Sequence, residues 1–235
     1  TWSALPLRPA GFGCLAEAWV APAAALVVAG LAPAVARATG LARRSIDPEQ
    51  ELDRIWRCGA HVITLRDPAY PALLRSIPNC PPLLFVKGSL EAKNDFAVAV
   101  VGTRKATSYG REAAHTIASD LARAQITIVS GLAKGIDAVA HRSALQAGGP
   151  TIAVLGTGVD VVYPAEHAKL AASIAESGAL VSDYPLGTKP EAQNFPARNR
   201  IIAGLSLGTV VVEAGERSGA LISASFALEQ GRDVF

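Results

Sequence analysis

The sequence predicts an α/β protein, with a doubly wound, mostly parallel sheet preceded by a small all-helical domain. After about residue 95, short apolar runs rich in Val and Ile recur roughly every 25 to 30 residues, and helical patterns lie between them. These runs are continuously apolar, which is typical of parallel strands buried on both faces by helices. The first 58 residues, by contrast, carry helical patterns only.

Composition predicts a sizeable folded core and says little about the ligand. The chain has 235 residues, of which 50% are hydrophobic and 18% charged. Its 22 Lys and Arg residues nearly balance its 20 Asp and Glu residues, so an anion-binding site requires local clustering of cations. The three cysteines, Cys14, Cys58 and Cys80, are widely spaced and outside any CxxC pattern. We therefore expect no disulfide framework or structural zinc, and a reducing, cytoplasmic setting.

One uncharged stretch, residues 18–36, slightly exceeds the ~18 residues that suggest a transmembrane helix. Pro22, Gly30 and Pro33 interrupt it and Ala dominates it, so we expect buried short helices and no membrane span. No basic segment precedes it, which argues against a secretory signal. The sequence stops at Phe235 inside an expected strand, and we expect it to be a piece of a longer protein.

The helical domain is expected to cover residues 1–58. Gly11-Phe12-Gly13 separates two apolar patterns, and Gly40 is expected to cap a helix at its C-terminus. Asp47-Pro48-Glu49 is typical of a helix start, with a capping carboxylate, Pro at the first helical position and an acid in the first turn. That helix is expected to stop at Gly59, where a second domain, residues 59–235, begins.

The second domain is expected to open with two short strands, at 61–64 and 83–87, joined by a Pro-rich connection. The apolar runs then predict strands at 97–101, 126–129, 152–155, 179–181, 209–212 and from 233 onward. The patterns between them predict helices at about 108–123, 136–147, 165–177, 196–205 and 219–230. In such a sheet, ligands bind beyond the carboxyl ends of the strands.

Two strand ends place a glycine turn, a hydroxyl and a cation in front of a helix. They are Gly102, Thr103, Arg104 and Lys105 after one run, and Ser130, Gly131 and Lys134 after the next. Backbone N–H groups, the helix dipole and the cations are expected to converge on an anion there. Asp137 and His141 lie one helical turn apart and could pair, but a helix-capping Asp and a satisfied His are expected rather than a metal site.

A third strand end, Gly156-Thr157-Gly158, has part of a dinucleotide fingerprint. Val161 stands where the third small residue belongs, and Pro164 closes a β-branched stretch. No helix therefore opens at the glycines to receive a pyrophosphate, and a nicotinamide or flavin dehydrogenase is not expected.

The densest cluster of candidate ligand-binding side chains is residues 194–200. It contains Asn194, Phe195, Arg198, Asn199 and Arg200. An aromatic ring beside cations is how proteins hold single-stranded nucleic acid, by stacking on bases and binding phosphates. Arginines in the first turn of a helix oppose the helix dipole and therefore favour an anion in front of them. The next strand end adds Glu213, Arg217, Ser218 and Gly219, whose Ser-Gly turn could present N–H groups to a phosphate.

The sequence shows no catalytic constellation. The four histidines, at 61, 115, 141 and 167, are scattered, and no GxSxG, HExxH or GK[ST] pattern is present. We therefore expect a binding module rather than an enzyme, with no cofactor and no metal.

Five segments resemble the DNA-processing protein A family (DprA, also called Smf) of bacterial natural transformation. They are residues 62–88, 101–110, 130–145, 151–170 and 182–235, the last containing NFPARNRIIAGLS and VVVEAGERSGALISASFALEQGRDVF. The resemblance implies an extended Rossmann-like domain after a small domain similar to SAM or helix-hairpin-helix modules. It also implies a non-catalytic protein that binds incoming single-stranded DNA, forms homodimers and loads the RecA recombinase onto that DNA.

The resemblance further implies which residues bind the DNA. The matching positions are Gly102, Thr103 and Arg104, then Ser130, Gly131 and Lys134, and finally Asn194, Phe195, Arg198, Asn199 and Arg200. Thr103 stands where the family more commonly has Ser, a change that keeps the hydroxyl. Many members continue past the position of Phe235 into a small winged-helix-like domain.

A second hypothesis is a nucleotide-binding Rossmann-like hydrolase related to the lysine-decarboxylase-like phosphoribohydrolases, which share a similar sheet. Their PGGxGTxxE signature should follow a strand, whereas the corresponding strand here leads into VVVEAGERSG. Release of free base from nucleoside monophosphates would distinguish this hydrolase from a DNA-binding module.

Overall fold

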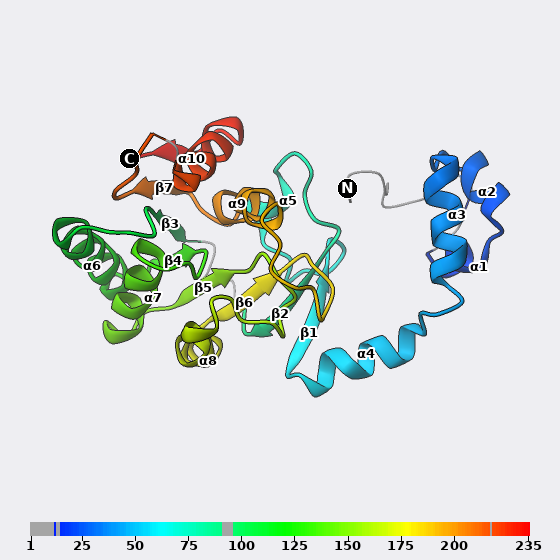
Figure 1. Ribbon diagram of the computed structural model, residues 1–235, viewed down its shortest axis with the longest axis horizontal. Helices are drawn as coiled ribbons and strands as arrows, with labels where there is room; N and C mark the ends of the chain where they lie inside the picture. Colours follow the sequence, from blue (N-terminus) through cyan, green and yellow to red (C-terminus); the bar gives the residue numbers. More distant parts are fainter. Residues whose placement is uncertain (1–11, 13–14, 91–95, 217) are drawn as a thin grey trace. The chain divides into compact units, whose positions relative to one another are not determined.

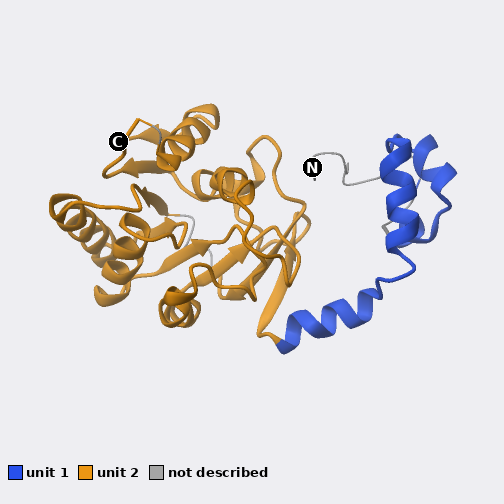
Figure 2. Ribbon diagram, viewed as in Figure 1, with its two compact units in different colours: residues 1–57 blue, residues 58–235 orange. Residues whose placement is uncertain are grey.

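The computed structural model describes residues 12, 15–90, 96–216 and 218–235. The chain forms two units, residues 1–57 and 58–235 (Figure 2), and the division lies beside the boundary expected near residue 58. Gly11, Gly13, Cys14 and Arg217, which the sequence analysis names, lie outside the described residues. Cys80 is a free thiol.

The N-terminal unit is helical. It contains α1 (Leu15–Val20), α2 (Ala23–Val28), α3 (Pro33–Ala42) and α4 (Pro48–Arg57). Ala21, Leu26, Leu31 and Ala36 form a small buried core. No helix in the described part of the chain has both the length and the apolar character needed to span a bilayer.

The predicted start of α4 is confirmed. The Asp47 carboxylate accepts the backbone N–H groups of Glu49 at 3.0 Å and Gln50 at 3.4 Å, two of the donors that have no partner within the helix.

The prediction for Gly40 is wrong, because Gly40 lies inside α3 rather than at its end. The helix continues past it, with the Arg43 N–H donating to the Thr39 carbonyl at 3.1 Å. A glycine inside a helix costs only about 1 kcal/mol relative to alanine, which the surrounding helical hydrogen bonds outweigh.

The C-terminal unit alternates strands and helices, as predicted (Figure 1). Its strands are β1 (Ala60–Thr64), β2 (Leu83–Gly88), β3 (Ala97–Val101), β4 (Thr127–Ser130), β5 (Thr151–Val154), β6 (Ala179–Ser182), β7 (Gly208–Val211) and β8 (Asp233–Val234). Its helices are α5 (Ala72–Arg75), α6 (Ser108–Arg123), α7 (Ile136–Gln146), α8 (Ala168–Ser177) after the 3₁₀ turn η3 (Ala165–His167), α9 (Asn194–Gly204) and α10 (Gly219–Glu229).

Helix α9 begins two residues earlier than expected, which brings Asn194 and Phe195 into its first turn. Pro196 therefore lies inside that turn rather than in front of it. Proline is tolerated there because the first N–H groups of a helix have no partner within it.

The strands form one eight-stranded sheet in the order β1-β2-β6-β5-β4-β3-β7-β8. Neighbours from β6 to β8 are parallel, whereas β2 runs antiparallel to β6 and β1 antiparallel to β2. The chain moves outward from β3 through β4 and β5 to β6, and then crosses to β7 on the other side of β3. The predicted extended Rossmann-like sheet is thus confirmed, with its reversal of strand order at β3.

Helices cover both faces of the parallel strands. Figure 1 shows α6, α7 and α8 on one face and α5, α9 and α10 on the other. Strand β3 is buried from both sides, because Val100 packs with α6 and α7 while Ala99 and Val101 belong to the cluster that includes Ile201 of α9. Because these strands are parallel, their carboxyl ends lie at one edge of the sheet.

His141 is a polar residue inside this core. It is fully buried on α7, and its Nδ1 lies 2.7 Å from the Thr151 hydroxyl, which itself donates to the Ile128 carbonyl at 2.8 Å. The hydroxyl therefore accepts from His141, which places the neutral ring's proton on Nδ1. A second proton would go to Nε2, which is buried without a hydrogen-bond partner in the described structure. Burial lowers the pKa of His141 to about 3, helped by the positive charge of Arg198.

We expect this histidine to make the fold acid-sensitive. Because the folded-state pKa is about 3 and the ordinary value 6.5, the unfolded chain binds the proton first as pH falls. The stabilisation is therefore complete above about pH 6.5 and is lost progressively toward pH 3, by about 2 kcal/mol between pH 7 and pH 5. Urea unfolding at several pH values measures this loss.

The control is His141→Asn, whose amide can still donate to Thr151 but does not titrate. We expect this variant to be less stable at pH 7 and to lose about 2 kcal/mol less than wild type between pH 7 and pH 5. Equal losses in both proteins would contradict the assignment to His141.

Candidate nucleic-acid interface

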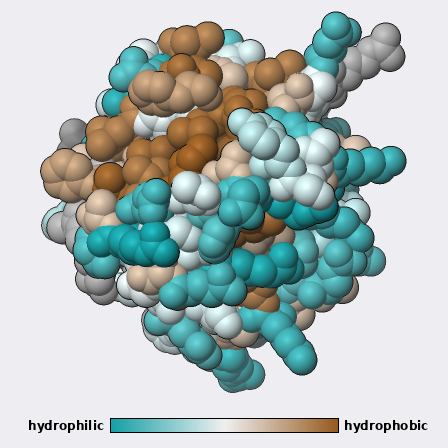
Figure 3. All heavy atoms as spheres, turned by 90° about the vertical axis from the view of Figure 1, so that its left-hand side faces the viewer, coloured by the Kyte–Doolittle hydropathy of each residue, from teal (hydrophilic) through white to brown (hydrophobic). Residues whose placement is uncertain are grey.

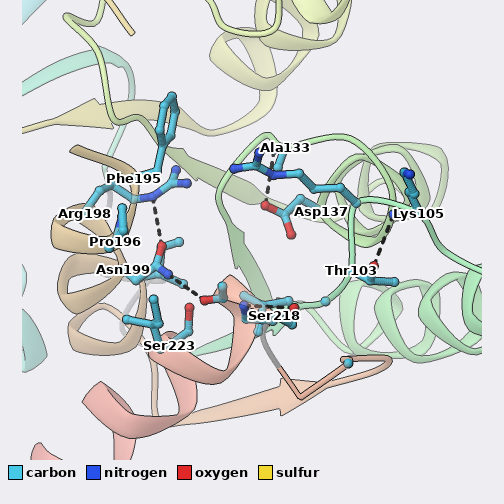
Figure 4. A pocket seen from close by; sticks show the side chains of 18 of the residues that line it. Thr103, Lys105, Ala133, Asp137, Phe195, Pro196, Arg198, Asn199, Ser218 and Ser223 are labelled. Carbon is cyan, nitrogen blue, oxygen red and sulfur yellow. Dashed lines mark hydrogen bonds between the residues drawn. The ribbon is translucent and has the colours of Figure 1, made fainter. Parts of the chain in front are cut away.

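A cleft of about 630 Å³ lies at the carboxyl edge of the sheet, where β3, β4 and β7 end (Figure 4). This is the point at which the strand order reverses, and ligands of doubly wound sheets bind there. Side chains and backbone from three strand-end loops and from α9 and α10 form its walls. The residues that line it include Thr103, Arg104, Lys105, Asp137, Phe195, Arg198, Asn199 and Gly219.

The loops after β3, β4 and β7 are joined through Thr103. Its N–H donates to the Glu213 carbonyl at 2.7 Å, and its carbonyl accepts the Ile136 N–H at 3.2 Å. Gly135 packs directly on the Thr103 carbonyl with a φ of 77°, so a side chain there would both clash and be strained. Gly135 therefore allows the backbones of two loops to pack closely.

The N-terminus of α6 already holds an anion, namely the side chain of Glu213. Its carboxylate accepts the backbone N–H and the hydroxyl of Thr107, each at 3.0 Å, and Thr107 in turn caps Gly110. The Glu213 carboxylate therefore lies at the positive end of the α6 dipole, where the sequence predicts a ligand anion, and anion binding by Gly102, Thr103 and Arg104 stays a prediction.

Arg104 and Lys105 carry the free positive charge of the cleft. Both are exposed, and neither side chain has an ion-pair partner among the described residues. The Arg104 guanidinium carbon lies 6.0 Å from the centre of the Phe195 ring, within the range of a cation–π contact. Lys105, which the sequence analysis did not carry into the site, is fixed through its backbone N–H, 3.2 Å from the Thr103 hydroxyl.

Phe195 and Tyr163 form an aromatic pair beside these cations. Their ring centres are 5.5 Å apart with a tilt of 40°, and Tyr163 is 45% exposed. Phe195 lies so close to Gly156 that a Cβ there would be 2.9 Å from its ring. Sequence reasoning missed Tyr163, although its place in the loop after β5, on the same sheet edge, was a usable signal.

Arg198 holds the floor of the cleft together rather than projecting free into it. It is 5% exposed, and its guanidinium donates to the carbonyls of Gly131, at 2.8 Å, and Val154, which end β4 and β5. Its Nε donates to Asn199 at 3.3 Å. Burial lowers the pKa of Arg198 to about 10, which leaves it charged at neutral pH, while the nearby Asp137 carboxylate favours that charge.

Asp137 is the buried counter-charge of Arg198. Its carboxylate accepts the Ala133 N–H at 3.2 Å, as Figure 4 shows. Burial raises its pKa, and the charge of Arg198 opposes that rise. Asp137 and His141 therefore have separate partners, and the pair that their spacing allowed is not what fixes either one.

The remaining predicted residues do not line the cleft. Ser130 is buried and donates to the Val100 carbonyl at 2.7 Å, and Gly131 packs against the Arg198 guanidinium. Lys134 forms an exposed ion pair with Glu166 at 2.8 Å. Arg200 pairs with Asp183 at 2.6 Å in a largely buried contact, and Asn194 is buried in the first turn of α9.

The structure therefore brings six of the predicted residues together at the cleft and separates five from it. Those at the cleft are Gly102, Thr103, Arg104, Phe195, Arg198 and Asn199. Those away from it are Ser130, Gly131, Lys134, Asn194 and Arg200. Asn199 contributes structurally, because its amide donates to the Gly219 carbonyl at 3.1 Å and so fixes the start of α10.

Fold and site together define an extended Rossmann-like protein with a cationic, aromatic cleft at the switch point of its sheet. A family model described as "DNA recombination-mediator protein A" matches residues 61–235, and the chain belongs to this family.

Curated relatives and solved structures agree with this assignment. Protein Smf of Escherichia coli is 51% identical over 74% of this chain, and DNA processing protein DprA of Streptococcus pneumoniae is 47% identical over 73%. The chain covers 47% and 61%, respectively, of the lengths of these two relatives.

Among solved structures, DNA processing protein A of Streptococcus pneumoniae superposes with a TM-score of 0.80 at 41% identity, covering 92% of this chain and 75% of that one. A Helicobacter pylori DNA processing protein A, described for its single-stranded DNA binding mode, gives a TM-score of 0.67 at 30% identity. That match covers 74% of this chain and 80% of the other.

We expect Arg198→Met to destabilise the fold. The substitution removes both guanidinium bonds to the strand-end carbonyls and leaves the Asp137 carboxylate buried without its counter-charge. Leaving a buried charge without its compensating charge, together with carbonyls that lose their donors, costs roughly 3 to 5 kcal/mol of unfolding free energy. Urea unfolding at neutral pH measures this cost.

The matched control is Arg104→Met, which removes an exposed guanidinium from the same cleft and should change stability by less than about 0.5 kcal/mol. An Arg198→Met protein as stable as wild type would show that Arg198 is not a structural tie.

Proposed function

We propose that this chain is the single-stranded-DNA-binding part of a non-catalytic recombination mediator. In the complete protein it would act in the cytoplasm during natural transformation and load the RecA recombinase onto incoming DNA. The observation that carries the DNA-binding part is the arrangement of Arg104 and Lys105 beside the Phe195–Tyr163 pair. Membership of the recombination-mediator family supports the wider role.

The cleft suits an unpaired strand better than a duplex. The aromatic pair offers a surface on which a base can stack, and only an unpaired base exposes both of its faces for this contact. The unpaired cations next to it can hold the phosphates that flank that base, and these contacts carry no sequence information. Single-stranded nucleic acid of any sequence is therefore the ligand that these groups fit.

The polar groups of the cleft have structural partners, which supports a binding rather than a catalytic role. Glu213, the carboxylate nearest to the signature position of the phosphoribohydrolases, is bound to Thr107 at the start of α6. The Asp137 carboxylate accepts the Ala133 N–H, and the positive charge of Arg198 stabilises it electrostatically. Neither carboxylate is presented to a ligand as a general base, so nothing in this geometry favours the hydrolase hypothesis.

Replacing Arg104 and Lys105 by Ala should weaken single-strand binding for every sequence alike. Each phosphate contact contributes a slope of about −0.7 to the plot of log affinity against log salt, so the double variant should flatten that slope by about 1.4. At 0.1 M salt this corresponds to about fivefold weaker binding per contact. Fluorescence anisotropy with oligonucleotides at several salt concentrations measures both quantities.

Two further variants separate charge in the cleft from other effects. Arg123→Ala removes a cation that pairs with Asp120 at the far end of α6, and should leave affinity and slope unchanged. Phe195→Leu should cost on the order of 1 to 3 kcal/mol of binding free energy with the slope unchanged, because stacking releases no counterions. If the Arg104 and Lys105 variant binds like wild type, the cleft is not the DNA site.

We also propose that the α/β unit forms a homodimer through α10 and β8. Figure 3 shows an apolar patch on the upper part of the face where these elements lie in Figure 1. The exposed apolar residues of α10 include Leu221, Ile222 and Leu228, and Phe235 follows β8; Leu228 and Phe235 are 66% and 74% exposed. Exposed patches of this kind mark interaction surfaces, and homodimers pair such patches about a two-fold axis.

We expect the protein to sediment as a dimer at tens of micromolar, on the order of ordinary dimer affinities. Leu228→Glu should make it monomeric, because a charge would be buried at the interface, without unfolding a side chain that is already exposed. Trp56→Glu, which alters a 62% exposed ring of α4, is the control and should leave the dimer intact. A wild-type protein that sediments only as a monomer would contradict the proposal.

A further inference from the structure

The N-terminal unit carries a groove of its own, of about 500 Å³. It lies between the end of α1, the start of α2 and the end of α3. Its lining residues are Val20, Ala21, Pro22, Ala23, Arg37, Gly40, Leu41, Arg43 and Arg44. Neither the proposed function nor the cleft of the α/β unit uses any of these residues.

The groove is positively charged without compensation. Residues 18–46 contain three arginines, Arg37, Arg43 and Arg44, and no Asp or Glu. Arg37 and Arg44 are exposed, and within the described residues neither has a hydrogen bond or ion pair from its side chain. Two guanidinium groups are thus available to an anionic ligand, each able to bind a phosphate through two parallel hydrogen bonds.

Arg43 differs from these two because it builds the groove. Its guanidinium donates to the carbonyls of Ala18, at 3.1 Å, and Ala21, where α1 ends. The same group lies 5.7 Å from the centre of the Trp19 ring. These contacts fix the end of α3 against the end of α1, so the groove has a defined wall without help from a ligand.

Two of the available groups lie on one side of α3. Arg37, Gly40 and Leu41 follow one another at intervals of three and one positions, which is one face of a helix. Arg44 follows the end of α3 at Ala42, and its N–H donates to the Leu41 carbonyl at 3.1 Å. Gly40 has no atom within 4 Å of the position that a Cβ would take, so the space over it is open.

On the basis of the single-strand binding proposed above, we propose that this groove is a second contact for single-stranded DNA, with Arg37 and Arg44 holding phosphates. The aliphatic side chains of Val20 and Leu41, 78% and 64% exposed, offer apolar contact to the bases or sugars between them. Two cations alone bind weakly. A strand already held by the α/β unit, however, is presented to the groove at a high effective concentration because the two units share one chain.

A cationic, partly apolar groove could also bind an acidic peptide. The covalent link between the two units favours nucleic acid instead. A strand bound at the cleft is held on the same chain as the groove, which raises its effective concentration there. An acidic peptide would have to bind through the groove alone. The groove then extends the length of strand that one chain covers and steepens the salt dependence of binding.

The test uses the full chain and the double variant Arg37→Gln/Arg44→Gln, which keeps long side chains with good helix propensity and leaves Arg43 in place. With a single-stranded oligonucleotide long enough to reach both units, we expect the salt slope to flatten by about 1.4 and affinity at 0.1 M salt to fall about 25-fold. Circular dichroism and thermal unfolding should match wild type.

The matched control is Arg54→Gln/Arg57→Gln, which removes the same charge from α4 of the same unit. Those arginines pair with Glu51 at 2.6 Å and with Asp53 at 3.8 Å, so they are not free for DNA. We expect this control to bind within about twofold of wild type at 0.1 M salt, since it removes no phosphate contact. If both double variants weaken binding equally, only the overall charge matters and the groove proposal is overturned.

Two further results separate this proposal from the function proposed for the cleft. The Arg104 and Lys105 variant could lose binding while Arg37→Gln/Arg44→Gln binds like wild type. This result would support the cleft as the DNA site and overturn the proposal for the groove. Poly-glutamate serves as the probe for an acidic peptide. If it binds wild type but not Arg37→Gln/Arg44→Gln, while oligonucleotide binding is the same for both, the groove is a peptide site and the proposal is wrong.

Discussion

The buried guanidinium of Arg198 is the contact on which the geometry of the cleft depends. It joins the carbonyls at the ends of β4 and β5, lies beside the Asp137 carboxylate, and bonds to Asn199, whose amide fixes the start of α10. One side chain of α9 thereby ties helices on both faces of the sheet to its carboxyl edge. Such a charge is tolerated in the interior because its donors bond to backbone carbonyls and the Asn199 side chain, and because the Asp137 carboxylate compensates its charge.

Once these internal partners are assigned, few polar groups of the cleft are left for a ligand. Glu213 neutralises the start of α6, Asn199 bonds to the Gly219 carbonyl, and Arg198 bonds to the carbonyls of Gly131 and Val154. The free cations that remain, Arg104 and Lys105, lie on a loop whose backbone is fixed by Thr103. Most charged side chains of the cleft are thus bound to other groups of the protein, and a small cationic and aromatic surface remains. This surface suits a ligand that is held through its phosphates and by stacking.

The sequence predicted the fold closely because its signals are local. The period of the apolar runs and the cap at Asp47 act within a few residues, so most elements were placed to within two residues. The site was harder, because partners are set by the three-dimensional arrangement. Arg198 and Arg200 are two positions apart yet face different elements, and Tyr163 meets Phe195 only because their loops share a sheet edge. No local pattern indicates which cation stays free.

Several loop glycines lie close to groups that shape the cleft, and this affects which substitutions a genetic screen of this protein would find. Added side chains at Gly131, Gly135 or Gly156 would overlap Arg198, the Thr103 carbonyl or the Phe195 ring. None of these glycines would itself hold DNA, yet substituting any one would displace a group that shapes the cleft. Alleles selected for lost binding at the cleft would therefore include these glycine positions. A map of contacts drawn from such alleles would show residues that support the cleft as well as residues that contact the ligand.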